Sequence, residues 1–185
     1  MAITELESQE KLIHLLLNNQ NLVSEFLADQ YGPEFFDQKY RVMLHGIEEC
    51  HHRSESFTEN YFLDFVTRSV ATGDYRKWSG SEVESSFFAQ QTEKRNFQLI
   101  ANLERVSVQD FPLVCRKVRE HYVKQQSMKL LDKFNKNNAK DYMSATRDLV
   151  DGMNVLVSDA NSSAASWVCV DEYGDDWYKE FEQQI

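Results

Sequence analysis

The sequence is poor in the residues that form tight turns, and this limits the fold classes open to it. Its 185 residues include 6 glycines and 2 prolines. So few turn-forming residues argue against a many-turned β-sandwich and against an α/β fold with glycine-rich nucleotide loops. No apolar run approaches the roughly 18 residues of a membrane helix, and the acidic N-terminus lacks the apolar core of a signal peptide. These absences predict a mostly helical protein in the cytoplasm, with no membrane contact.

Cysteine is also scarce, and the three cysteines offer neither a disulfide framework nor a metal site. Cys50, Cys115 and Cys169 are odd in number and far apart, which is typical of a reducing compartment. The run Cys50, His51 and His52 contains metal-ligand types. Neighbouring residues on a helix project about 100° apart, however, so these three cannot readily converge on one ion. The run is therefore predicted to be an exposed helix end, and no metal is expected.

Apolar residues make up 42% of the chain, enough for a core, and their spacing predicts about six short helices in residues 1–107. A first helix spans 4–18, with a capping box at its start. Asn21 is expected to cap the second helix and Thr58 the fourth, after a third that ends in the polar stretch 50–56. Residues 72–81 are predicted to form a loop, and two further helices begin at about Val83 and Phe97.

Residues 108–157 are predicted to form two long antiparallel helices, joined by a polar turn at 135–138. Pro112 falls in the first turn of the first helix, where proline is tolerated. The hairpin is either part of the core or an association surface, and its length of roughly 40 Å favours association with another subunit. The predicted subunit interface consists of Phe111, Cys115, Val118, Tyr122, Leu130, Phe134, Met143, Leu149 and Met153.

Residues 158–185 are predicted to be a flexible linker followed by a short amphipathic helix. The stretch 158–166 is small, polar and without periodicity. A helix this short is unstable alone, so it must dock, either on a neighbour or back on its own domain. Its predicted docking residues are aromatic: Tyr173, Trp177, Tyr178 and Phe181.

No catalytic pattern accompanies these elements. The sequence holds no phosphate-binding loop, no G-x-S-x-G elbow and no H-E-x-x-H pair. His14 is predicted to be a hydrogen-bonded histidine at the edge of the core, and paired acids such as Glu48 and Glu49 to be solvated surface. A small helical enzyme using Asp or Glu with His remains the least favoured hypothesis, because it needs a buried polar cluster.

Charge is unevenly distributed along the chain. The 20 basic and 30 acidic residues give a net charge of −10, yet residues 108–147 hold 9 basic and 4 acidic residues. This basic stretch is either a solvated helix face, a contact to nucleic-acid backbone, or a contact to the acidic surface of a partner. The residues singled out for such a contact are Arg116, Lys117, Arg119 and Lys124.

Four segments, taken in order, resemble the N-terminal region of DnaB-type replicative DNA helicases. Residues 9–19 (QEKLIHLLLNN) are similar to that family's opening helix, and residues 35–44 (FFDQKYRVML) to its next element. Residues 111–120 (FPLVCRKVRE) resemble the first helix of its hairpin. Residues 171–182 (DEYGDDWYKEFE) are similar to the linker region of phage helicases of the T-even type.

The resemblance implies a non-catalytic collar domain that helps to assemble a hexameric ring, with hairpins pairing between subunits. It implies contacts with primase and helicase loader, weak or indirect contact with DNA, and a linker helix that docks on the ATPase domain of an adjacent subunit. The host is then a bacterial or phage-infected cell. The sequence stops at Ile185, before any ATPase domain, so ATP and Mg²⁺ would belong to the missing motor and no cofactor is expected in this chain. The alternative is a standalone helical adaptor, such as a helicase loader or a phage-encoded regulator.

Overall fold

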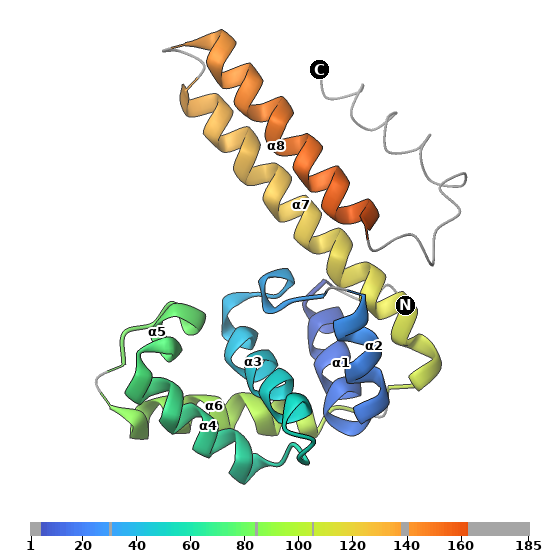
Figure 1. The fold of residues 1–185 in the computed structure, drawn as a ribbon, viewed down its shortest axis with the longest axis vertical. Coiled ribbons are helices and arrows are strands. Elements are labelled where there is room, and N and C mark those ends of the chain that lie inside the picture. Colours follow the sequence, from blue (N-terminus) through green and yellow to red (C-terminus); the bar gives the residue numbers. More distant parts are fainter. Residues whose placement is uncertain (1–4, 30, 84, 105, 138–140, 163–185) are drawn as a thin grey trace. The chain divides into compact units, whose positions relative to one another are not determined.

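The computed structural model describes residues 5–29, 31–83, 85–104, 106–137 and 141–162. These residues form eight α-helices and two short 3-10 helices, with no strand among them, and 84% of them are helical. The predicted all-α fold is therefore confirmed. The chain divides into two compact units, Met1–Gln126 and Ser127–Ile185, and Figure 1 shows the helices that belong to them.

The first unit is a bundle of six helices completed by the start of a seventh. Two 3-10 turns, Pro33–Phe35 and Val108–Asp110, precede α3 and α7. The α-helices are α1 (Glu5–Asn18), α2 (Gln20–Ala28), α3 (Gln38–His52), α4 (Glu59–Thr72), α5 (Asp74–Ser79), α6 (Ser86–Ala101) and the beginning of α7 (Phe111–Asn137).

At the end of helix α1, two asparagine side chains donate hydrogen bonds to backbone carbonyls of its last turn. Asn18 donates its amide N–H to the carbonyl of His14 at 2.8 Å, and Asn19 donates to the carbonyl of Leu15 at 3.0 Å. These bonds place side-chain donors in the last turn, where a helix runs out of backbone N–H donors. Asn19, not the predicted Asn21, is the residue that precedes α2. The predicted capping box of α1 involves Thr4, which lies outside the described residues.

The core of the first unit forms around α3, which packs against α1, α2, α4 and α5. Gly46 lets α3 approach α4 closely. A Cβ at this position would lie 3.1 Å from the ring of Phe57 and 3.3 Å from the rings of Phe62 and Phe65. A larger residue would therefore push three packed aromatic rings apart, which is costly in a close-packed core.

Thr58 caps α4, as the sequence predicts. Its hydroxyl accepts a hydrogen bond from the backbone N–H of Tyr61 at 3.2 Å. Thr58→Ala is expected to lower the free energy of unfolding by about 1 kcal/mol, because the N–H then has only water as a partner. Urea unfolding followed by circular dichroism measures the loss. Thr58→Ser keeps the hydroxyl and should retain most of the stability, so an equal loss in both variants would contradict the capping role.

Residues 72–102 depart from the predicted organisation. Residues 74–79 were expected in a loop but form the short helix α5, between Gly73 and Gly80 in the left-handed conformation. Tyr75 anchors α5 because its side chain is buried in the core. The two helices expected from about Val83 and Phe97 are one continuous helix, α6. The polar residues between the two apolar stretches do not interrupt the helix: Gln91, Thr92 and Arg95 are exposed, whereas Glu93 is buried in the core.

The boundary between the two units lies within α7, further along the chain than the predicted boundary after residue 107. The first half of α7 belongs to the bundle because Val114, Cys115 and Val118 are buried in its core. Polar contacts add to this packing. The Asp37 carboxylate accepts a hydrogen bond from Gln125 at 3.3 Å and lies 3.7 Å from His121 Nε2.

The second unit is the helical hairpin that the sequence predicts, formed by the end of α7 and by α8 (Tyr142–Ser162). Helix α8 extends to Ser162, so residues 158–162 are helical rather than part of the predicted linker. The rest of that linker and the predicted amphipathic helix lie outside the described residues.

Candidate self-association interface

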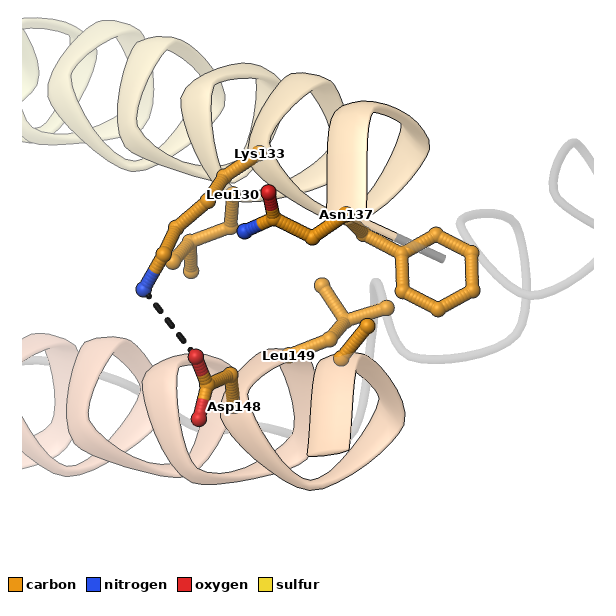
Figure 2. Close-up of a pocket in the computed structure, with 7 residues that line it drawn as sticks. Leu130, Lys133, Asn137, Asp148 and Leu149 are labelled. Carbon is orange, nitrogen blue, oxygen red and sulfur yellow. Dashed lines mark hydrogen bonds and ion pairs between the residues drawn. The ribbon is translucent and has the colours of Figure 1, made fainter. Parts of the chain in front are cut away.

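The two helices of the hairpin meet along an apolar seam. Leu130 of α7 and Leu149 of α8 lie between the two helices (Figure 2), and Phe134 and Ala145 line the same small cavity. The cavity between these side chains measures about 10 Å³, no more than the space that one water needs. The seam is therefore a helix-packing contact and not a ligand pocket.

Polar and aromatic contacts fix the register of this seam. Lys133 Nζ lies 3.2 Å from a carboxylate oxygen of Asp148 (Figure 2). The ring centres of Phe134 and Tyr142 are 6.1 Å apart. Gly152 permits close approach further along, since a Cβ there would lie 2.7 Å from Leu130 Cδ2. The face of α8 that packs on α7 is thus occupied within one chain.

A second apolar face of α8 has no cover among the described residues, and we call it the outer face of α8. Met143, Val150 and Val157 are exposed by 75%, 51% and 56%. They recur every seven residues, with the half-buried Thr146 and Met153 between them. A helix turns by 100° per residue, so these five side chains form one stripe, about a third of a turn away from the stripe that contacts α7.

The predicted interface residues fall into three groups. Phe111, Cys115 and Val118 are buried in the core of the first unit, and Tyr122 is half-buried with its ring 4.5 Å from that of Phe35. Leu130, Phe134 and Leu149 line the seam between α7 and α8. Only Met143 and Met153 lie on the outer face of α8. Association through this hairpin would thus involve few of the residues chosen from sequence.

The basic residues proposed for nucleic-acid or partner contact are also divided. Arg119 packs its guanidinium 4.4 Å from the ring centre of Tyr31 inside the first unit. Arg116 lies 3.6 Å from Glu120 on the surface, Lys117 is half-buried and Lys124 is exposed. Arg119 therefore serves packing, and the accessible positive charge at the start of α7 comes from the other three.

The histidine and cysteine side chains with reactive or metal-binding chemistry, His14, Cys50 and Cys115, are buried and make structural contacts. His14 is buried at the edge of the core, as predicted, with Nδ1 donating to the carbonyl of Ile100 at 2.9 Å. Cys50 is buried rather than exposed, and its thiol donates to the carbonyl of Glu55 at 3.1 Å. Burial and the nearby carboxylates raise the pKa of Cys115 to about 12, which keeps that thiol protonated.

Over the described ranges there is neither a group of three metal-ligating side chains nor a helix long and apolar enough to cross a membrane. A surface hollow of about 320 Å³ lies between the end of α4 and residues 82–83. Its charged lining residues, Arg76 and Glu82, are exposed and paired with each other. Such a solvated ion pair lacks the burial that shifts a pKa for catalysis.

Comparison with protein-family models, with curated proteins and with solved structures gives no match to this chain.

Two sets of exposed apolar residues are not among the residues predicted from the sequence. Val150 and Val157 lie on the outer face of α8, and their seven-residue spacing from Met143 was a signal that could have identified them. Phe87, Phe88 and Leu99 of α6 are the second set. Phe87 and Phe88 fall in the helix expected from about Val83, and that expectation does not say whether their rings are exposed.

Proposed function

We propose that this chain is a non-catalytic assembly module that pairs with a second copy through the outer face of α8. The observation that carries the proposal is the exposure of Met143, Val150 and Val157 at seven-residue spacing, beside a separate face already packed on α7. Burying such a stripe against the same stripe of another copy stabilises a dimer by removing apolar side chains from water.

The biological setting that we propose is the N-terminal collar of a DnaB-type hexameric replicative helicase. The resemblance of residues 9–19, 35–44, 111–120 and 171–182 supports this setting, as does the order of a helical bundle followed by a hairpin. In that role the chain mediates ring assembly and contacts with primase or helicase loader, and the motor domain supplies ATP hydrolysis.

The pairing surface is tested by placing charge on it. The double variant Met143→Glu, Val150→Glu is expected to sediment as a smaller species than the unchanged chain, because four carboxylates would be buried in the dimer. Val155→Glu is the matched control, since Val155 is equally exposed but lies on another side of α8. Analytical ultracentrifugation across a concentration series compares the three proteins.

The control should leave the sedimentation unchanged, and circular dichroism should show the same helix content in all three. If the double variant and the unchanged chain have the same mass at every concentration, the outer face of α8 is not the pairing surface.

The helicase setting is tested separately from the pairing surface. Sequencing the gene beyond the codon for Ile185 is expected to reveal a reading frame that continues into a G-x-x-x-x-G-K-S/T phosphate-binding loop. A stop codon at that point would contradict a collar fused to a motor and favour the standalone adaptor.

A further inference from the structure

Helix α5 is a short element that depends on its neighbours for its conformation. It has six residues, and a helix of this length is not stable without tertiary contacts. Both of its ends are glycines in the left-handed conformation, with φ of 79° at Gly73 and 65° at Gly80. Glycine adopts positive and negative φ about equally readily, so both ends can act as hinges.

Two aromatic side chains hold α5 on the bundle. The ring of Trp78 stacks on Phe65 of α4, with 5.6 Å between ring centres, and on His45 of α3, with 4.3 Å. Tyr75 is 2% exposed and donates its hydroxyl to the carboxylate of Glu93 in α6 at 3.1 Å. Both anchors thus lie on the same side of the short helix, facing the core.

The charged side chains of α5 add little to these anchors. Arg76 pairs with Glu82, and both are exposed. Lys77 pairs with Asp74 of α5 itself, at 2.8 Å. Exposed ion pairs of this kind contribute little to stability, so the position of α5 depends mainly on Tyr75 and Trp78.

Tyr75 lies between a buried carboxyl group and the surface. Its hydroxyl contacts Glu93, and its side chain also borders the surface hollow of about 320 Å³. Glu93 is 2% exposed, and the described groups that act on it are Tyr75 and Asn96. Helices α1, α3 and α4 also pack on α6, yet no described cation of theirs offsets a charge on Glu93; His14 of α1 bonds to Ile100, two turns away.

We propose that α5 is a strap that swings outward about Gly73 and Gly80 when Glu93 loses its proton. An ionised carboxylate is much more stable in water than in a buried site without a cation, and the departure of Tyr75 admits water to it. Such an opening leaves α4 and α6 folded and uncovers the ring of Phe65, on which Trp78 packs. The inference goes beyond the proposed function, because it concerns the bundle and not the outer face of α8.

The pH range follows from the proton that the closed strap retains. Burial raises the pKa of Glu93 to about 7 in the closed position, although hydrogen bonds from Tyr75 and Asn96 lower it. In water the same group loses its proton near pH 4.5. The closed strap is therefore fully stabilised below pH 4.5, and this stabilisation is lost as the pH rises to 7. The ratio of open to closed strap should rise by up to about 300-fold, the factor for about 2.5 pH units.

Hydrogen exchange with mass spectrometry measures this opening in the full chain. The unchanged chain is compared with Glu93→Gln at each pH from 4.5 to 8, so that intrinsic exchange rates and the titration of His45 cancel. Amides of residues 74–79 are expected to exchange equally in the two proteins near pH 4.5, and up to about 300-fold faster in the unchanged chain at pH 8. Glu82→Gln removes an exposed acid beside α5 and should behave as the unchanged chain does.

Low urea concentrations separate opening of the strap from unfolding of the whole unit. A local opening exposes little surface, so exchange in residues 74–79 should hardly change between 0 and about 1 M urea at pH 8. Exchange in α4, which requires global unfolding, should accelerate with urea.

Tyr75→Phe gives a second variant that keeps the ring in the core. It removes the hydroxyl that lowers the pKa of Glu93, so the acceleration of exchange between pH 4.5 and 8 should be larger than in the unchanged chain. A tyrosine that only fills space would change exchange by one factor at every pH. That result, equal exchange of residues 74–79 in Glu93→Gln and the unchanged chain at pH 8, or equal acceleration of α4 and α5 by urea would overturn the inference.

Discussion

Val118→Asp is expected to unfold the first unit and not merely to weaken association between subunits. The Val118 side chain is 0% exposed and lies in the core beside Val114 and Cys115. A carboxylate at this position would be buried without a partner. Losses above about 4 kcal/mol are typical of unpaired buried charge, which is a large part of the stability of a small domain. Far-UV circular dichroism with urea unfolding at low micromolar concentration measures the effect.

The same substitution at an exposed valine provides the control. Val155→Asp places the carboxylate in water on a side of α8 away from the outer face, and the helix content should be preserved. A Val118→Asp variant that keeps native helix content and unfolds at the same urea concentration as Val155→Asp would contradict the placement of α7 in the core.

Glu93 is expected to make the first unit less stable as the pH rises through neutrality. Its side chain is 2% exposed, and burial raises its pKa to about 7. Two hydrogen bonds act in the opposite direction: Tyr75 donates its hydroxyl at 3.1 Å and Asn96 donates its amide at 3.4 Å. They lower the pKa of Glu93 by less than burial raises it.

The sign of the pH effect follows from the proton that the folded state retains. A glutamate in the unfolded chain loses its proton near pH 4.5, whereas folded Glu93 keeps its proton until about pH 7. The stabilising contribution is therefore complete below pH 4.5 and is lost as the pH rises through 7. A difference of about 2.5 pH units corresponds to about 3 kcal/mol.

Glu93→Gln should remove this pH dependence, because glutamine stays neutral and keeps an oxygen that can accept from Tyr75. The variant is expected to match the unchanged chain near pH 4.5 and to exceed its free energy of unfolding by about 2–3 kcal/mol at pH 8. Urea unfolding at several pH values measures the difference.

Glu104→Gln replaces an exposed acid and serves as the control, for which no comparable divergence with pH is expected. A constant difference between Glu93→Gln and the unchanged chain at all pH values would show that Glu93 ionises normally in the fold.

Local signals in the sequence were enough for most helices of the first unit. The cap of α4 at Thr58 could be predicted, because a threonine before an apolar periodic stretch is a local signal that does not depend on the rest of the chain. The prediction of a loop was wrong for residues 74–79, because it relied on the glycines on either side of them, Gly73 and Gly80. The burial of Tyr75 against α6, which stabilises α5, is a tertiary contact that local patterns do not contain.

The exposed residues of the candidate interface were also hard to predict from the sequence, because tertiary contacts decide which faces of a helix are covered. Val118 and Met143 occur at equally good helical spacing, yet the first is in the core and the second is exposed. Periodicity identifies which residues share a face of a helix, but not what covers that face. In α8 there are two such faces, and only the packing of Leu149 against α7 reveals that the stripe of Met143, Val150 and Val157 is the uncovered one.

The mass of the unchanged chain in solution tests the central claim most directly. One copy has a mass of 21.7 kDa. Light scattering coupled to size exclusion is expected to give a dimer or a larger species whose mass rises with concentration, because the outer face of α8 pairs between copies. A constant mass of 21.7 kDa up to the highest concentration tested would contradict the assembly function.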